Sequence, residues 1–148
     1  MPSAQDELFE ETISADMKDK NTGKAGEDYA AKYLKRRGYL IIARNYAIVG
    51  GELDIVALKG RTLVFVEVKT RSSEEMGSAS AAVDIRKQNC LKKAKSDFLS
   101  RFGKNSKVPH YFLNIRFLHK YSRCRFDIIE IYFSDGKAKA VHKKDAFS

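Results

Sequence analysis

Two stretches of the chain repeat their apolar residues at the spacing of an α-helix. The first runs from Lys24 to Arg37 and ends before Gly38, and the second runs from about Ala79 to Phe102 with Gly103 directly after it. Apolar residues three and four positions apart lie on one face of a helix, and glycine is common just past a helix end. The pattern therefore predicts two amphipathic helices.

Short runs rich in β-branched and aromatic residues predict strands between these helices and after the second one. Turns that contain glycine lie on both sides of the run Leu53–Leu58. The pair Asp135-Gly136 is of a type that is common in turns between antiparallel strands. The expected strands are Tyr39–Arg44, Leu53–Leu58, Thr62–Lys69, Tyr111–Leu118 and Phe126–Phe133, followed by a short edge strand at Lys139–His142. This order predicts an α/β fold in which helices flank a mixed central sheet.

Charge is distributed unevenly along the chain. The acidic arm, residues 1–23, has six acidic side chains and two lysines, so its net charge is −4, whereas the whole chain of 148 residues has +9. Residues 24–148, the expected folded domain, therefore have +13. A domain this basic attracts a polyanion, because each neutralised phosphate releases counterions, although a solvated basic surface would have the same composition. We expect the arm to be a disordered tail or a short helix, and it could shield the basic surface.

Composition argues against several other classes of protein. No apolar run approaches the roughly 20 residues that span a bilayer, and the N-terminus lacks the apolar stretch of a signal peptide. The two cysteines, Cys90 and Cys124, have no metal-ligand spacing, and the sequence has no glycine loop of the Walker or dinucleotide type. We therefore expect a cytoplasmic protein that does not bind membranes.

Five charged residues occupy positions where the pattern predicts burial. Glu67 and Lys69 end the strand Thr62–Lys69, which is otherwise apolar on both faces, and Asp54 lies in the apolar strand Leu53–Leu58. A buried charge is costly unless it is paired or bound to a metal. These three side chains therefore call for a partner or a ligand.

The other two charged residues lie on the apolar faces of the predicted helices. Glu27 has the helical spacing of Ala30 and Leu34, and Lys87 has that of Leu91. Each of the five could belong to a structural ion pair, and the strand that contains Glu67 could simply run into solvent there. Three carboxylates and two lysines on inward faces of one small domain favour a single polar site instead.

A site of this composition has a defined chemistry. Asp54 and Glu67 meet if their strands pair, and two carboxylates without histidine or thiolate favour a hard cation, Mg²⁺ or Mn²⁺. Such an ion could activate a water molecule and stabilise charge on a phosphoryl oxygen. Lys69 points to the same side as Glu67, where it could orient the water or stabilise the transition state. With a basic surface to hold the backbone, metal-dependent hydrolysis of a nucleic acid is chemically coherent.

The residues around these positions resemble the YraN-like family of the PD-(D/E)XK nuclease superfamily, whose arrangement archaeal-type Holliday junction resolvases share. The resemblance covers about residues 24–133 and is most specific at Phe65–Arg71, which reads Phe-Val-Glu-Val-Lys-Thr-Arg. The letter P in the name PD-(D/E)XK denotes a proline, and this chain has Leu53 at that position, which is variable in the superfamily. The other matching stretches are Gly26-Glu27, Gly38-Tyr39, Arg44-Asn45, Gly51-Glu52-Leu53-Asp54, Lys87 and Arg125-Phe126-Asp127.

The resemblance implies a restriction-endonuclease-like αβββαβ core and a nuclease site. It implies that Asp54 and Glu67 bind the metal, that Lys69 is the catalytic lysine and that Glu27 is a supporting acid, while Lys87 is a further catalytic candidate. The expected protein is a Mg²⁺- or Mn²⁺-dependent endonuclease that acts on structured or branched DNA, with DNA favoured over RNA. Related resolvases cut as dimers, so this chain could form a homodimer.

Two other functions stay open at this point. The chain could be a catalytically silent nuclease-fold protein that binds nucleic acid or assists DNA processing, because the same fold serves many roles and some members have lost catalysis. It could also be an interaction protein whose acidic arm engages a basic partner.

Several further residues have weaker patterns. Arg44, Thr70 and Arg71 could contact phosphates, although surface arginine is common and Thr70 could simply end its strand. Glu52 could be an additional metal ligand or an acid at the edge of a turn, and Asp127 is expected to have a structural role. Four tyrosines could stack on bases, but their spacing favours the core: Tyr29, Tyr33, Tyr39 and Tyr46.

Overall fold

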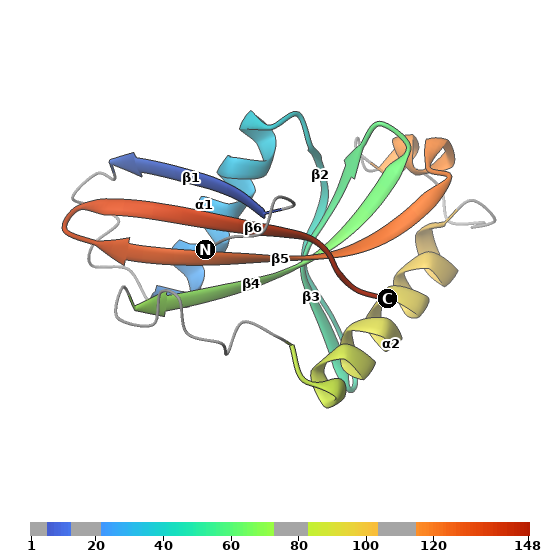
Figure 1. Ribbon diagram of the computed structural model, residues 1–148. Helices are drawn as coiled ribbons and strands as arrows, with labels where there is room; N and C mark the ends of the chain where they lie inside the picture. The colour runs from blue at the N-terminus through green and yellow to red at the C-terminus, as the bar shows by residue number, and fades with distance from the viewer. Residues whose placement is uncertain (1–5, 13–21, 73–82, 104–114) are drawn as a thin grey trace.

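The computed structural model describes residues 6–12, 22–72, 83–103 and 115–148, and in it a six-stranded sheet lies between two helices (Figure 1). No helix in these ranges is long and apolar enough to cross a membrane. The helices are α1 (Thr22–Arg36), α2 (Ile85–Phe102) and η4 (Ile115–Lys120), which is a 3₁₀ helix. The strands are β1 (Asp6–Thr12), β2 (Leu40–Ile48), β3 (Gly51–Lys59), β4 (Thr62–Ser72), β5 (Arg123–Ser134) and β6 (Lys137–Phe147).

The strands follow the order β1-β6-β5-β4-β3-β2 across the sheet. β4 and β5 are parallel to each other, and every other neighbouring pair is antiparallel. β3 and β5 contain long runs of consecutive buried residues, which explains why their sequences are nearly continuous apolar runs. The mixed sheet flanked by helices confirms the predicted fold class and is consistent with a restriction-endonuclease-like fold.

The two helices cover opposite faces of the sheet, and the alternation along β4 shows this directly. Val64 packs in the cluster that contains Leu34 of α1, whereas the next residue, Phe65, packs in the cluster that contains Phe98 of α2. Successive side chains of a strand point to opposite faces of the sheet, so every second side chain of β4 packs on the α1 side and the others pack on the α2 side. The four tyrosines lie in these clusters, as their spacing predicted: Tyr29, Tyr33 and Tyr39 on the α1 side and Tyr46 on the α2 side.

α2 lies very close to the turn between β2 and β3. A Cβ atom on Gly51 would stand 2.5 Å from the carbonyl oxygen of Cys90, so only glycine allows this approach. The helix begins at Ile85, directly after Asp84, whose carboxylate accepts a hydrogen bond of 2.9 Å from the backbone N–H of Lys87. The predicted start at about Ala79 is therefore too early, because residues 83 and 84 are not helical; residues 79–82 lie outside the described ranges.

The predicted strand Tyr111–Leu118 is wrong for the part that the structure describes. Residues 115–118 belong to η4, and residues 111–114 lie outside the described ranges. Leu118 is buried in the α2-side cluster, and its carbonyl oxygen accepts a hydrogen bond of 3.2 Å from the backbone N–H of Tyr121. A short apolar run does not by itself distinguish a strand from a helix, and here the local turn satisfies the backbone.

β6 is longer than the predicted strand Lys139–His142, and it is not at the edge of the sheet. β1 pairs antiparallel with β6 and forms the edge instead. β1 belongs to the acidic arm, so the expected tail or short helix is wrong for Asp6–Thr12. The remaining described residues of the arm, Thr22 and Gly23, are the first two of α1.

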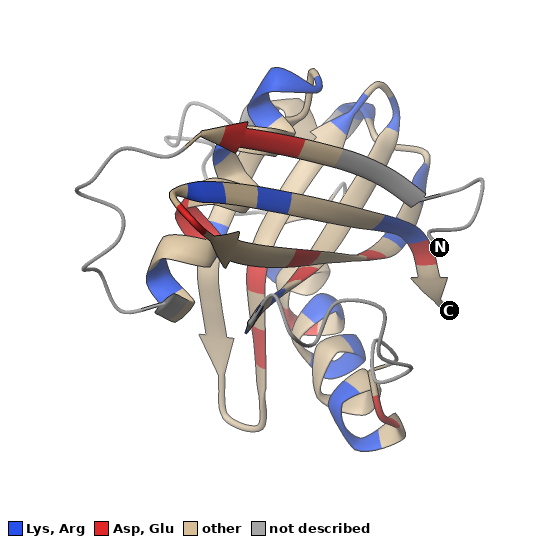
Figure 2. Cartoon of the chain, turned by 60° about the vertical axis from the view of Figure 1, so that its left-hand side comes forward, with Lys and Arg blue, Asp and Glu red and all other residues tan. Residues whose placement is uncertain are grey.

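Apolar packing and ion pairs explain why this acidic segment joins the sheet. The ring of Phe9 lies 5.7 Å from that of Tyr33 on α1, measured between centroids. Glu11 forms ion pairs with Lys32, at 3.3 Å, and with Arg36. In the strand register Glu10 lies opposite Lys139 of β6, and Figure 2 shows the acidic end of β1 running beside β6.

Candidate functional site

The predicted site lies where two central strands separate. β3 and β4 pair antiparallel as far as Ile55 and Val66. The next residue of β3, Asp54, does not continue this ladder, and its Oδ2 atom accepts a hydrogen bond of 2.8 Å from the backbone N–H of Val68. The Asp54 side chain thus takes the place of a backbone hydrogen-bond partner for the N–H of Val68. This hydrogen bond holds the Asp54 carboxylate beside Glu67.

Both carboxyl groups at this point are largely removed from solvent, since Asp54 and Glu67 are each 9% exposed. Nζ of Lys87, on α2, lies 3.4 Å from Oε1 of Glu67. The other oxygen, Oε2, is buried and has no hydrogen-bond partner among the described residues. Buried polar atoms without a partner are rare in native proteins, and each one requires an explanation such as a bound ion or a functional role.

Burial and mutual repulsion control the protonation of this pair. Burial raises the pKa of Asp54, against the hydrogen bond from the Val68 N–H and the charge of Lys87. Burial, followed by the neighbouring charge of Asp54, raises the pKa of Glu67 to about 7, and Lys87 opposes this shift. The two carboxyl groups therefore hold their protons more strongly than free carboxyl groups do, even with the ammonium group of Lys87 beside Glu67.

The donor atoms at this position fit a hard divalent cation. They are carboxylate oxygens only, which is the donor type that Mg²⁺ and Mn²⁺ prefer, and Oε2 of Glu67 has a coordination position to offer. Asp54 and Glu67 could hold such an ion. Within the described ranges no three Asp, Glu, His or Cys side chains are grouped as a metal centre, so the candidate ligands are this pair.

The remaining predicted catalytic residues surround the pair. Glu27 of α1 is half-buried, and burial, followed by the charge of Asp54, raises its pKa, so the two carboxylates lie within electrostatic reach of each other. Lys69 follows Glu67 on the same face of β4, where burial, followed by the charge of Arg71, lowers its pKa. The structure thus brings the predicted carboxylates and lysines to one end of the β3–β4 pair.

The predicted phosphate contacts lie in three different environments. Arg44 of β2 forms an ion pair of 2.7 Å with Asp28, and both side chains are about one-third exposed. Nε of Arg71 lies 3.3 Å from Oε2 of Glu130. Thr70 points toward α1, away from Glu67, and its hydroxyl is buried with no hydrogen-bond partner among the described residues. Glu52, the alternative metal ligand, is exposed.

Sequence reasoning missed a buried carboxylate on β5, next to the candidate site. Glu130 is 3% exposed, lies opposite Lys69 in the parallel register, and accepts a hydrogen bond of 2.5 Å from the Tyr132 hydroxyl. Its Oε1 lies 2.6 Å from Nζ of Lys143, and Arg71 pairs with its other oxygen. A signal was available, because an acid stands inside the apolar run Phe126–Phe133.

Asp127 has the structural role that was expected of it. It is fully buried and accepts hydrogen bonds from Nε (2.7 Å) and Nη2 (2.9 Å) of Arg125. Its Oδ2 lies 2.7 Å from Nε2 of His142, and its Oδ1 accepts a hydrogen bond of 3.0 Å from the backbone N–H of Asp145. These contacts join β5 to β6 on the α1 side of the sheet.

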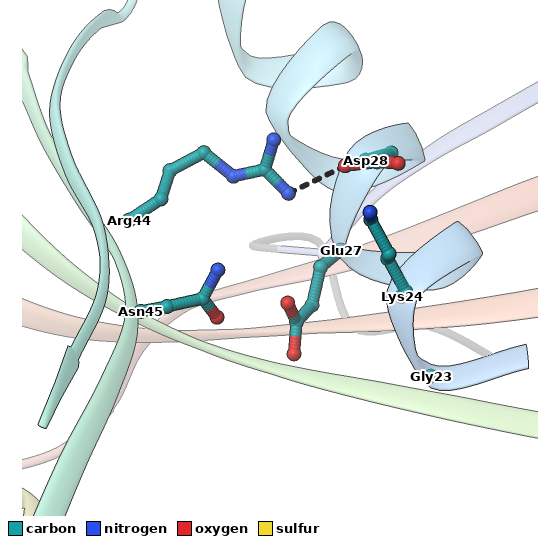
Figure 3. Close-up of a pocket in the computed structure, with 6 residues that line it drawn as sticks. All are labelled: Gly23, Lys24, Glu27, Asp28, Arg44 and Asn45. Atoms are coloured by element: carbon teal, nitrogen blue, oxygen red, sulfur yellow. Dashed lines mark hydrogen bonds and ion pairs between the residues drawn. The ribbon is translucent and has the colours of Figure 1, made fainter. Parts of the chain in front are cut away.

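A pocket of about 490 Å³ opens beside Glu27, between the first turns of α1 and the middle of β2 (Figure 3). The ion pair between Arg44 and Asp28 lies at one side of it. The residues that line the pocket are Gly23, Lys24, Glu27, Asp28, Arg44 and Asn45.

Comparison with known proteins assigns a family but no activity. The model of the uncharacterised protein family UPF0102 matches residues 26–131. The chain is 39% identical to a UPF0102 protein of Dictyoglomus thermophilum, over 80% of this chain and 87% of that protein. It is 37% identical to one of Alkaliphilus oremlandii (86% and 98%) and 41% identical to one of Syntrophomonas wolfei (82% and 93%). The chain therefore belongs to the UPF0102 family.

Proposed function

We propose that this protein is a metal-dependent nuclease of the PD-(D/E)XK type, which hydrolyses phosphodiester bonds in structured or branched DNA. One observation carries the proposal: two buried carboxylates meet where β3 and β4 separate, and one oxygen of Glu67 has no hydrogen-bond partner among the described residues. The order of Asp54, Glu67 and Lys69 along two paired strands supports it, because this is the pattern of the superfamily that the sequence resembles. The net charge of +9 supports an anionic substrate.

In this proposal Asp54 and Glu67 hold Mg²⁺ or Mn²⁺. When bound, the ion supplies Lewis-acid stabilisation of a phosphoryl oxygen and lowers the pKa of a water molecule. The backbone N–H of Val68 orients the Asp54 carboxylate, and the ammonium group of Lys87 orients that of Glu67. These two contacts fix the ligands before any substrate binds, which is the property that a catalytic site requires.

Lys69 has a separate role, which is to stabilise negative charge on the reacting phosphoryl group. It lies on the same face of β4 as Glu67, two residues further along. An ammonium group placed where charge develops stabilises the transition state more than the ground state. In this proposal the carboxylate of Glu27, which lies within electrostatic reach of Asp54, orients a water molecule near the pair.

The test is cleavage of labelled single strand, duplex, flap and four-way junction DNA, and of matched RNA, with Mg²⁺ or Mn²⁺. We expect metal-dependent cleavage that falls by about 100-fold or more in Glu67→Ala and in Lys69→Ala, the range typical of a lost catalytic group. Glu10→Ala is the matched control, because this exposed acid lies on β1 and pairs only with Lys137 among the described residues. Its activity should equal that of the wild type.

The same experiment can contradict the proposal. If the wild type and both variants bind the substrates equally and cut none of them, the protein is a nuclease-fold binding or accessory protein. Cleavage that persists in both variants would show a contaminating enzyme or a different active site. Thermal unfolding of each variant, measured in parallel, separates a catalytic loss from a loss of structure.

A further inference from the structure

A backbone irregularity in β2 lies directly beside the candidate metal site. Asn45 has φ of 51°, in the left-handed region that residues other than glycine rarely adopt. The pairing of β2 with β3 passes from Arg44 and Ile55 to Tyr46 and Leu53, so Asn45 is the residue opposite Asp54. Asparagine tolerates this conformation better than most residues, but it is unusual in the middle of a strand. Such outliers concentrate at functional sites.

The consequence of this conformation is that the Asn45 side chain faces the pocket beside α1 (Figure 3). Its amide group points toward the space between Arg44 and Glu27. The amide has no hydrogen bond to any other described residue, although it carries two donors and an acceptor. A polar group is thus presented to the pocket, ready to bind a ligand.

The other groups in the pocket define the charge of that ligand. Arg44 is held by Asp28 at 2.7 Å, which fixes its guanidinium at the rim and leaves further N–H donors. Lys24 of α1 also lines this pocket. Glu27 lies at the inner side, within electrostatic reach of both Arg44 and Asp54. Two cations, Lys24 and Arg44, therefore line the pocket together with the acids Asp28 and Glu27, and the Glu27 carboxylate lies within electrostatic reach of Asp54.

We infer that this pocket binds the nucleotide next to the phosphodiester that is cut, with its phosphate on Arg44 and Lys24 and its base edge on the Asn45 amide. The volume of about 490 Å³ lies within the range of small-ligand sites. Asparagine can donate and accept on adjacent atoms, which matches the hydrogen-bonding edge of a base such as adenine. The inference rests on the proposed function, because the cut bond is placed at Asp54 and Glu67.

The variants that test it separate the amide from the backbone. Asn45→Gly keeps the left-handed conformation, which glycine adopts readily, and removes only the amide. Asp135→Gly is the matched control, because Asp135 has φ of 49° in the turn between β5 and β6, far along the chain from the pocket. Arg44→Ala removes a phosphate contact. All are combined with Glu67→Gln, so that binding is measured without cleavage.

The measurement is the affinity for short fluorescent oligonucleotides that differ in one base at a time, over a range of salt concentrations. We expect the parent to prefer some bases by about 5- to 150-fold, the range for one bidentate contact, and Asn45→Gly to lose this preference. Arg44→Ala should weaken binding of every sequence and reduce the salt slope by about 1. Asp135→Gly should match the parent in both respects.

The outcomes distinguish this inference from the proposed function. If the wild type cuts DNA and Asn45→Gly binds every sequence as the parent does, the pocket inference is overturned while the nuclease stands. If the wild type cuts nothing but base preference depends on Asn45, the nuclease proposal fails and with it the position of the pocket next to a cut bond, while the contact between Asn45 and a base stands. Weaker binding in Arg44→Ala without any effect of Asn45→Gly would reduce the pocket to an anion site and overturn the base contact.

Discussion

Replacing Asp127 with alanine should destabilise the fold more than any other single removal of a carboxylate described above. The side chain is fully buried and has four contacts within 3.0 Å: two from Arg125, one with His142 and one from the backbone N–H of Asp145. The variant leaves the guanidinium of Arg125, 15% exposed, without its carboxylate. Among the described residues, the hydroxyl of Tyr39, at 3.2 Å from Nη2, is then the hydrogen-bond partner that remains for Arg125.

The magnitude follows from the burial of both partners. Breaking a buried ion pair by removing one member costs about 3–5 kcal/mol, because the other charge stays buried. An exposed pair is worth only about 0–1 kcal/mol. Asp28→Ala is the matched control, since Asp28 also pairs with an arginine, but both side chains are about one-third exposed. A loss of about 3–5 kcal/mol is a large fraction of the roughly 5–15 kcal/mol of a typical domain.

The assay is urea unfolding followed by circular dichroism, with the free energy of unfolding compared among wild type, Asp127→Ala and Asp28→Ala. The double variant Asp127→Leu with Arg125→Met should recover part of the loss, because it removes the unpaired guanidinium of Arg125 but leaves Nε2 of His142 and the backbone N–H of Asp145 without their acceptor. A cost in Asp127→Ala no larger than in Asp28→Ala would refute the reasoning. So would a double variant that is less stable than Asp127→Ala.

The pH dependence gives an independent check on the same carboxylate. Burial alone would raise the pKa of Asp127, but its hydrogen bonds to His142 and Arg125 lower it below the ordinary value. A carboxyl group with a lowered pKa in the folded state stabilises the protein above its unfolded-state pKa, and this stabilisation is lost as pH falls through the folded-state pKa. The difference in stability between wild type and Asp127→Ala should therefore be full at neutral pH and shrink in acid. A difference that grows in acid would contradict this assignment.

Three further predictions concern the site and its supports. Burial and the charge of Asp54 raise the pKa of Glu67 to about 7, so protons compete with a metal ion for this carboxylate. The affinity for Mn²⁺, measured by calorimetry, should therefore fall from pH 8 to pH 6. An affinity that does not change with pH would contradict this prediction. Gly51→Ala should lower the free energy of unfolding by about 1–3 kcal/mol, because the new Cβ atom would lie 2.5 Å from a carbonyl oxygen of α2. Gly23→Ala is the control: its Cβ atom would meet nothing within 4 Å, so it should not destabilise the protein in thermal unfolding. Thr70→Val removes a buried hydroxyl that has no hydrogen-bond partner among the described residues, so thermal stability should stay unchanged or rise slightly and DNA binding should stay unchanged. If the variant loses DNA binding, Thr70 contacts a phosphate as the sequence predicted.

The central part of the fold could be predicted because its strands are buried on both faces. β3, β4 and β5 read as near-continuous apolar runs, so the few charges inside them stood out and pointed to the candidate site. Helical spacing placed Lys87 on the inward face of its helix, and its Nζ lies 3.4 Å from Oε1 of Glu67. Asp54 was placed beside Glu67 from the short turn between their strands, but no local pattern predicted that its carboxylate accepts a hydrogen bond from the backbone of β4.

Other features could not be predicted from single elements. β1 is half acidic, and its pairing with β6 depends on cross-strand lysines and on α1, which are distant in the sequence. The sequence could have placed Thr70 correctly, because Thr70 is an even number of residues from Val64 and Val66 and therefore points to the α1 side of β4, whereas Glu67 points to the other side. The left-handed Asn45 has no local signal beyond the residue type, and only the sheet register shows that it lies opposite Asp54.

β1 also determines how the sheet meets other protein molecules. Without it, β6 would present a row of unpaired N–H and C=O groups along its length, and exposed strands of this kind template pairing with other chains. The opposite edge, β2, is interrupted by the left-handed Asn45 and by a register shift between Ile41 and Ala43, which makes it a poor template. The family match begins at residue 26, after β1. A protein that begins at residue 26 and keeps β6 would therefore gain an open, lysine-bearing edge, and self-association through β6 would be a product of the truncation.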